Sequence, residues 1–293
     1  MTDGRWGPDR AAGSSTEWLS ALDIPEPGPQ SRLTVLLRLL LLIPHFVVLF
    51  FLYIAAFFTV IAGWFAALVL GRLPEPIFRF LGGYLGYHTR VGASAMLLVD
   101  RYPPFTLTPP ADYPVQIALR PEPLNRLAVF FRLILLIPVA IVESLVTWGW
   151  WALCLIWWLI TLILGRMPRP LFEASAATLR YQMRYYAYGM LLTSAYPKRL
   201  FGDRATVTEE PARSAVTGEP ARSATRPLLV SDLGKALIVL FLVAGVACGS
   251  TSSFASHTED DEFKYTGNGA HRQPLSYPGC PVGTRAGAWC AHR

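Results

Sequence analysis

The sequence predicts an all-α integral membrane protein built from two tandem repeats, each with one long kinked transmembrane helix and one amphipathic interfacial helix. Three observations carry this prediction. Residues 32–105 return 94 residues later without an insertion or deletion. Each copy holds a run with almost nothing ionisable, 39–70 and 133–164. Only 16% of the 293 residues are charged, against about 25% in a typical soluble domain.

The repeated motifs mark the same places in both copies. The block Arg-Leu-x-Val-x-x-Arg-Leu-x-Leu-Leu-Ile-Pro fills 32–44 and returns at 126–138, and Gly-Arg-x-Pro-x-Pro fills 71–76 and returns at 165–170. Self-similarity at a fixed offset means that each copy is one structural unit. We therefore expect the same elements in the same order in both repeats.

The apolar run of the first copy predicts a transmembrane helix that begins at Pro44 and ends at Leu70, because proline suits the first turn of a helix and not its interior. Its length of about 40 Å against about 30 Å of hydrocarbon favours one tilted crossing. The alternative is two half-length helices that enter and leave on the same side, with a break at Gly63 or, in the second copy, at Gly149.

The Gly-Arg-x-Pro-x-Pro motif predicts a turn at the membrane surface, because glycine suits the end of a helix and proline the start of the next. The helix that follows carries Arg79, Arg90 and Arg101 on one stripe, opposite an apolar face. We expect it to lie in the plane of the interface with its arginines toward lipid phosphates. The competing interpretation is a crossing helix whose charged face is buried against its partner span.

The rest of the chain is assigned from composition. A third, weaker transmembrane helix is predicted after the repeats, and the polar segments beside it cannot bury enough apolar surface to offset the entropy of ordering. The predicted order is a polar N-terminal segment (1–30), membrane repeat 1 (31–105), a Pro-rich connector with a short strand at 115–119 (106–125), membrane repeat 2 (126–202), a flexible linker (203–227), a C-terminal transmembrane segment (228–255) and a disordered tail (256–293).

Residue usage predicts a multi-pass protein of a bacterial plasma membrane. Arginine outnumbers lysine 23 to 3, which is typical of a GC-rich bacterial genome. The N-terminal segment lacks the apolar core of a cleavable signal peptide, so we expect the first span to act as a signal anchor. With one crossing per repeat, the charge bias puts the N-terminus and residues 165–235 in the cytoplasm, whereas two crossings per repeat reverse the side of the connector.

The four cysteines predict neither a metal site nor a cofactor. Cys154 and Cys248 lie in or at the end of apolar runs, where cysteine behaves as a small hydrophobic residue. Cys280 and Cys290 in the tail pair only if the tail faces an oxidising compartment. Their spacing does not match that of metal ligands.

The repeated blocks, with Arg90 or Arg184 leading to a Tyr-Pro pair, resemble the bacterial membrane family described as domain of unknown function 4389. The resemblance covers about residues 20–202 in two copies. It implies an integral membrane protein and brings no catalytic residue, ligand or cofactor with it. The second copy departs from the first by placing Glu143 where the first has Leu49.

The repeated arginines are the candidates for contact with lipid headgroups, because arginines flank the apolar runs and can reach the phosphates. For Arg38 and Arg132, binding to a helix C-terminus is the alternative. The candidates are Arg38, Arg72, Arg90, Arg132, Arg166 and Arg184.

Two further ionisable residues lie inside the apolar runs, Glu143 and His45. A charge in hydrocarbon costs about 2.5–3.5 kcal/mol, so Glu143 raises the hypothesis of ion or proton handling. Contact with headgroups or with Arg132 is the alternative for this carboxylate. His45 fits an interfacial residue better than a ligand.

These features favour a non-enzymatic envelope scaffold or lipid-interacting component over an enzyme. The sequence contains no phosphate-binding loop, nucleophile elbow, HExxH motif or paired carboxylates. The basic residues flank apolar runs instead of forming one stripe, which favours a lipid bilayer over nucleic acid as partner. A homo-oligomer or a complex with another membrane protein is compatible with this. The second hypothesis is a small transporter or channel in which Glu143 faces a polar cavity.

Overall fold

The computed structural model describes residues 20–108, 110, 112–202 and 228–249, which are mostly helical. Residues 1–19, the predicted linker, and the predicted tail with Cys280 and Cys290 lie outside the described residues. The elements are β1 (Ala21–Asp23), α1 (Arg32–Leu70), α2 (Glu75–Ala95), β2 (Gln116–Ala118), α3 (Arg126–Phe130), α4 (Arg132–Ala152), α5 (Cys154–Leu164), α6 (Arg169–Gly189) and a C-terminal helix, Asp232–Gly249. Strand β2 lies within the stretch predicted as a strand.

Helix α1 does not begin at Pro44, as the sequence had predicted, but runs through it from Arg32 to Leu70 without interruption. A proline inside a helix removes one backbone hydrogen bond and costs about 3 kcal/mol or more. The cost is offset because buried residues lie on both sides of Pro44, among them Val35, Leu42 and Ala56, so packing holds both halves in line. The ring of Pro44 itself faces outward.

The alternative of a helix break at Gly63 or Gly149 is not found. Helix α1 continues through Gly63, and the second copy breaks at Phe131 and Leu153 instead, which separate α3, α4 and α5. The amide of Leu153 is shared between the carbonyls of Gly149 and Trp150, a tightened turn that interrupts the regular α-helical pattern.

The ends of the long helices are held by bonds between the repeats, and these bonds come in pairs related by the 94-residue offset. The amide of Gln30 donates to the carbonyl of Gly165, and the amide of Leu124 donates to the carbonyl of Gly71, both at 2.9 Å. Gly71 and Gly165 both end their helices in the left-handed conformation, with φ near 70°, which glycine adopts without strain. Each long helix therefore ends against the start of the other repeat.

Two further contacts repeat in the same way. The indole of Trp64 donates to the carbonyl of Val129 at 3.1 Å, and the equivalent indole of Trp158 donates to the carbonyl of Val35 at 2.8 Å. Strands β1 and β2, from equivalent parts of the two repeats, pair antiparallel. The two repeats are thus related by a pseudo-two-fold axis that passes through the β1–β2 pair.

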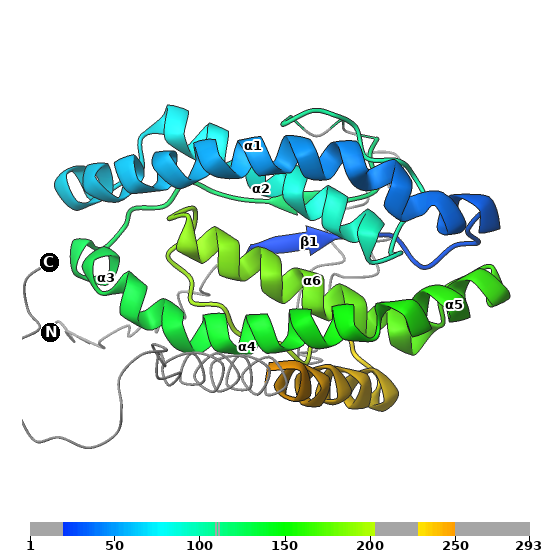
Figure 1. The fold of residues 1–293 in the computed structure, drawn as a ribbon. Helices are drawn as coiled ribbons and strands as arrows, with labels where there is room; N and C mark the ends of the chain where they lie inside the picture. Colours follow the sequence, from blue (N-terminus) through cyan, green and yellow to red (C-terminus); the bar gives the residue numbers. More distant parts are fainter. Residues whose placement is uncertain (1–19, 109, 111, 203–227, 250–293) are drawn as a thin grey trace, which may run out of the picture. The chain divides into compact units, whose positions relative to one another are not determined.

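This symmetry fixes the direction of the long helices. A two-fold rotation keeps the height of every point along its axis, so Gly71 and its equivalent Gly165 lie at the same height. Because Gln30 is bonded to Gly165, the beginning and the end of α1 are also level with each other. Helix α1 and its counterpart α4–α5 therefore run across the axis, and Figure 1 shows them running in opposite directions on the two sides of α2 and α6.

The amphipathic helices α2 and α6 lie between the two long helical segments (Figure 1) and pack against each other. Most of α6 and about half of α2 are buried, including Leu81 and Leu85 of α2 and Phe172 and Leu179 of α6. Helix α2 contacts α1 and α6, and α6 contacts α4 and α2, so both helices are surrounded by protein on several sides. The predicted interfacial position of these helices is thus corrected, because their apolar faces form the core between the repeats.

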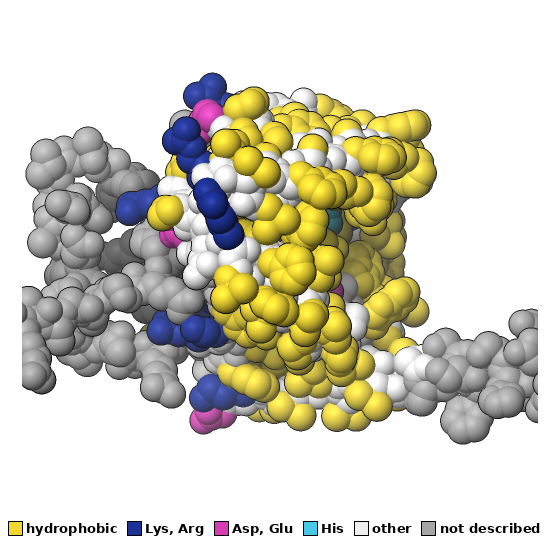
Figure 2. Space-filling model, turned by 90° about the vertical axis from the view of Figure 1, so that its left-hand side faces the viewer, with side chains coloured by type: hydrophobic (Ala, Val, Ile, Leu, Met, Phe, Trp, Pro, Cys, Tyr) yellow, Lys and Arg dark blue, Asp and Glu magenta, His cyan; other side chains and the backbone are white. Residues whose placement is uncertain are grey.

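The long helices bury only a narrow stripe and expose large apolar side chains along their whole length, from Leu33 to Leu70 and from Leu133 to Leu164. Exposed charged residues lie at helix ends and in connectors, including Arg32, Arg72, Glu75, Arg101, Asp112, Arg126 and Arg166. Figure 2 shows the lysine and arginine side chains along one side of the molecule, with a hydrophobic surface over the rest of the view. Helices α1, α4 and the C-terminal helix are long and apolar enough to cross a membrane.

The C-terminal helix packs on α4 at a pair of glycines, Gly149 and Gly245. A Cβ atom on Gly149 would overlap the backbone of Phe241, and one on Gly245 would overlap the backbone of Leu145. Small residues let two helix backbones approach closely, which is a common basis of helix association in membranes. The first repeat has Ala55 in place of Gly149.

We predict that Gly245→Leu weakens the packing of the C-terminal helix by about 1–3 kcal/mol, because overpacking forces the two backbones apart. The measurement is the midpoint of unfolding in a detergent titration. Gly249→Leu is the matched control, since a Cβ there meets nothing within 4 Å. Equal effects of both variants would contradict the close glycine contact.

Candidate functional site

Four of the six candidate arginines are buried anchors for backbone carbonyls. The guanidinium group of Arg38 donates to the carbonyls of Ser94, at 3.2 Å, and Val99, and pairs with Asp100 at 2.6 Å. In the second repeat, Arg132 donates to the carbonyl of Thr193, the residue equivalent to Val99. Both arginines thus bind the carbonyls that follow the end of an amphipathic helix.

Arg132 lacks the carboxylate partner of its counterpart, because Ser194 stands where the first repeat has Asp100. Its guanidinium carbon lies 4.1 Å from the ring centre of Tyr188, a cation–π contact. The aromatic ring thus replaces part of the interaction that a carboxylate makes with Arg38.

Arg90 and Arg184 repeat this role in the interior of α2 and α6. Arg90 donates to the carbonyl of Thr106, and Arg184 donates to the carbonyls of Ser20 and Lys198, both at 3.2 Å. They therefore hold the connector of the first repeat, the segment after α6 and the start of the described chain against the helices.

These contacts correct the prediction that Arg38, Arg90, Arg132 and Arg184 reach lipid headgroups. Each side chain is buried, with at most 7% of its residue surface exposed. The physical reason is that chain segments ending inside an apolar body leave carbonyls that no water reaches, and arginine supplies several donors to one place. For Arg38 and Arg132, the alternative of binding a helix C-terminus is the one that the structure supports.

Arg72 and Arg166 are exposed at the ends of the long helices, as headgroup contact requires. Each has a second arginine nearby from the other repeat. A Cβ on Gly71 would lie 3.5 Å from the Nε of Arg126, and a Cβ on Gly165 would lie 3.9 Å from the Nε of Arg32. Two arginine pairs, Arg72 with Arg126 and Arg32 with Arg166, thus stand at the two ends of the long helices.

Glu143 is buried in α4 and does not reach the surface. Its carboxylate accepts a hydrogen bond from Thr147 at 3.0 Å and another from Gln182 of α6. Arg132 is held by Thr193 and Tyr188, so Glu143 contacts neutral groups and not Arg132, which the sequence had left as an alternative partner.

His45 is fully buried in the first repeat. Its Nδ1 lies 2.6 Å from the hydroxyl of Tyr87, and its ring stacks on Phe105 with the centres 3.9 Å apart. This is the environment of a packed core histidine and not of the predicted interfacial residue. In the described part of the chain, no three metal-ligating side chains come together.

A clasp orders the connector on the charged side of the molecule. Arg101 donates to the carboxylate of Asp112 at 2.7 Å and to its carbonyl at 2.9 Å, which holds the pKa of Asp112 below its ordinary value. The hydroxyl of Tyr113 donates to the carbonyl of Arg101 at 3.1 Å, and burial raises the pKa of Tyr113 to about 12. The connector is therefore folded onto the repeats and is not a loose loop.

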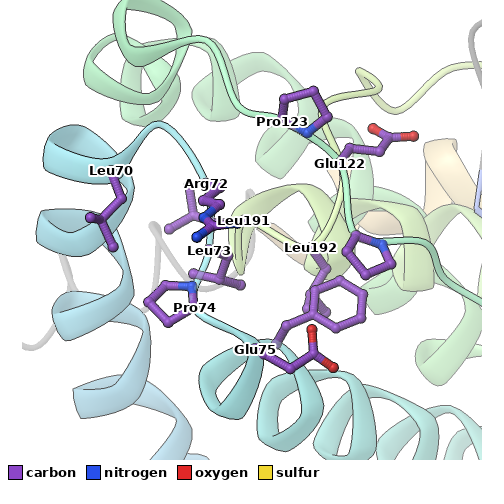
Figure 3. Close-up of a pocket in the computed structure, with 11 residues that line it drawn as sticks. Leu70, Arg72, Leu73, Pro74, Glu75, Glu122, Pro123, Leu191 and Leu192 are labelled. Atoms are coloured by element: carbon purple, nitrogen blue, oxygen red, sulfur yellow. The ribbon is translucent and has the colours of Figure 1, made fainter.

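A pocket of about 570 Å³ opens beside the turn between α1 and α2, and we call it the rim pocket. Figure 3 shows Arg72, Glu75 and Glu122 around it, with Leu73 and Leu191 among its apolar walls. Glu75 also pairs with Arg79 at 2.8 Å, and the carboxylate of Glu122 accepts two hydrogen bonds from Ser194. The pocket thus combines a cation, two carboxylates and apolar walls, which suits an amphiphile whose head carries both signs of charge.

Sequence reasoning identified Arg72 in this pocket and missed Glu75 and Glu122. Glu122 lies in the connector, about fifty residues from Arg72, and the two segments are brought together by the bond between Leu124 and Gly71 and the bridge between Pro123 and Arg72. The signal available in the sequence was the acidic residue between the prolines of each motif, Pro74-Glu75-Pro76 and Pro121-Glu122-Pro123.

Both repeats match the model of one protein family. The model of the family described as domain of unknown function (DUF4389) matches residues 32–106 and again residues 126–200. The chain belongs to this family. Its two matched segments are the two tandem repeats, and both end in the connectors that the buried arginines hold. The search of curated proteins and the search of solved structures each found no match.

We predict that Arg38→Met lowers the free energy of unfolding by about 2 kcal/mol or more, because buried carbonyls left without donors cost about 1–3 kcal/mol each. The measurement is unfolding by a detergent titration followed by helical circular dichroism. The control is Arg72→Met, which removes an exposed arginine of the same repeat and should change stability little. A larger loss for the control would contradict the anchoring role of Arg38.

Proposed function

We propose that the protein is a non-enzymatic, lipid-interacting component of the bacterial plasma membrane whose long helices lie in the plane of one leaflet. In this arrangement the apolar surface of α1, α4 and α5 contacts acyl chains, and the charged helix ends and connectors face the headgroups. The observation that carries the proposal is that lysine and arginine side chains gather along one side of the molecule (Figure 2), although exposed arginines stand at both ends of α1, Arg32 at its start and Arg72 after its end.

The length of the exposed apolar surface supports this arrangement over a crossing. The segment from Leu33 to Leu70 measures about 56 Å at 1.5 Å per residue. To fit about 30 Å of hydrocarbon, a straight helix of this length would need a tilt of roughly 60° or more. A helix parallel to the surface keeps all of these side chains in the acyl region.

The connectors supply an independent argument. Asp100 is bonded to Thr34 at the start of α1, whereas Leu124 is bonded to Gly71 at its end. If α1 crossed the bilayer, the chain between 100 and 124 would have to cross back in extended form with Asp112 exposed. Irregular backbone in contact with lipid is not tolerated in hydrocarbon. The in-plane arrangement leaves this connector at the headgroup side.

The charged side chains of the rim pocket and the two arginine pairs indicate which lipid headgroups the protein would bind. The guanidinium of Arg72 suits a phosphate, and the carboxylates of Glu75 and Glu122 suit an ammonium group. A phospholipid with a primary amine in its head carries both, and its acyl chains would continue along Leu73 and Leu191. In this proposal the protein inserts a broad apolar surface into one leaflet. Such an insertion would let it act as a scaffold that shapes or marks a region of the membrane.

A cysteine-labelling experiment tests the in-plane arrangement. Single cysteines at Glu26, Glu75 and Asp112 are introduced after the native cysteines are replaced, and oriented vesicles are treated with an impermeant maleimide. Since these positions precede α1, follow α1 and lie in the connector, we expect all three to react from the same side. Reaction of Glu26→Cys and Glu75→Cys from opposite sides would overturn the proposal.

The rim pocket is tested by the phospholipid that stays bound. We expect Arg72→Gln to lower the fraction of protein that carries one phosphatidylethanolamine, about fivefold, because a charge-assisted hydrogen bond to phosphate is lost. Native mass spectrometry from mild detergent measures this fraction. Arg169→Gln removes an exposed arginine outside the pocket and is the control. The same loss in both variants would indicate a general charge effect and not a pocket.

A further inference from the structure

A second cavity, of about 330 Å³, lies between the two repeats. Helices α1 and α4 contribute Tyr53 and Trp151 to its lining, and α2 and α6 contribute His88, Gln182 and Tyr186. The volume is at the lower end of the range of about 300–1,000 Å³ that is typical of small-molecule sites. We call it the central cavity.

The polar groups of the central cavity are neutral and clustered. The ring of His88 meets Tyr186 edge-on with the centres 5.0 Å apart, and it lies 6.1 Å from the ring of Tyr84. Gln182 occupies in the second repeat the position that His88 occupies in the first, so the two side chains face each other across the pseudo-two-fold axis. Gln182 is further fixed by its hydrogen bond with Glu143.

The mouth of the cavity belongs to the apolar surface. Phe46, Phe50 and Tyr53 line the cavity and are at the same time exposed, with 43%, 60% and 57% of their surface accessible. In the in-plane arrangement proposed above, this surface contacts acyl chains. A ligand would therefore enter the cavity from the hydrocarbon of the bilayer. This route of entry rests on the proposed function.

We propose that the central cavity binds the ring head of a membrane-dissolved, quinone-type molecule. Three requirements select this class. Entry from hydrocarbon requires a neutral molecule, because a charged head would lose its hydration. Aromatic walls from Tyr84, Tyr186 and Trp151 favour a flat ring. The hydroxyl, imidazole and amide groups of the lining can donate hydrogen bonds, which ring carbonyls accept.

A phospholipid fits the cavity less well. Its phosphate would need a cation, and the lining contains none, whereas the rim pocket has Arg72. The two sites thus divide by chemistry, with charged heads at the rim and a neutral ring between the repeats.

The test is binding of menadione, a naphthoquinone without a tail, to the full chain in detergent micelles, followed by quenching of tryptophan fluorescence. The structural control ligand is 2-methylnaphthalene, which keeps the fused rings and lacks the carbonyls. We expect saturable quenching by menadione, and we expect 2-methylnaphthalene to displace menadione only at a concentration at least tenfold higher. Binding in micelles does not depend on how the helices lie in a bilayer, so failure here is distinct from failure of the labelling experiment.

Three variants locate the site. His88→Phe keeps a ring and removes the imidazole donor, so we expect menadione affinity to fall about fivefold to tenfold. His88→Gln restores a donor of the kind already present at Gln182 and should recover most of the affinity. Tyr102→Phe removes a hydroxyl outside the cavity and should change nothing. Equal affinity of all variants, or equal binding of both ligands, would overturn the proposal, and circular dichroism verifies that each variant is folded.

Discussion

The reciprocal bonds that tie the end of each long helix to the start of the other repeat are the constraint on which the rest of the fold depends. Gln30 with Gly165 and Leu124 with Gly71 are one contact made twice. Because of these bonds, the two ends of each long helix lie at the same height along the pseudo-two-fold axis. Helices α2 and α6 pack in the space between the long helices. They also bring both connectors to the same region, so the charged residues gather on one side of the molecule (Figure 2).

Buried arginines make this arrangement possible in an apolar body. A helix that ends inside such a body leaves carbonyls without donors, and each unsatisfied carbonyl is costly. Arg38 and Arg132 bind these carbonyls from the neighbouring helix, which explains the second arginine of the repeated block. Because the same residue type also suits a phosphate, the sequence could not distinguish a structural arginine from a lipid contact.

The repeat, its offset and the family could be predicted from the sequence because they are patterns of identity along the chain. The interior proline was different. Local preference puts Pro44 at a helix start, and only the packing of residues before and after it lets α1 pass through. Likewise, Arg72 was identified from its place at a helix end, but its neighbour Glu122 depends on a contact between repeats that periodicity cannot reveal.

Some of the differences between the two copies lie where the structure has a use for asymmetry. Gly149 replaces Ala55 at the place where the C-terminal helix docks, so only the second repeat receives it. Gln182 replaces His88 across the pseudo-two-fold axis, and Glu143 replaces Leu49 beside it. A duplicated fold needs the same arginines and glycines in both copies to close its helices, but a single cavity between the copies is free to take different side chains from each. The divergence of Gln182 from His88 thus lies in the lining of the cavity proposed as a ligand site.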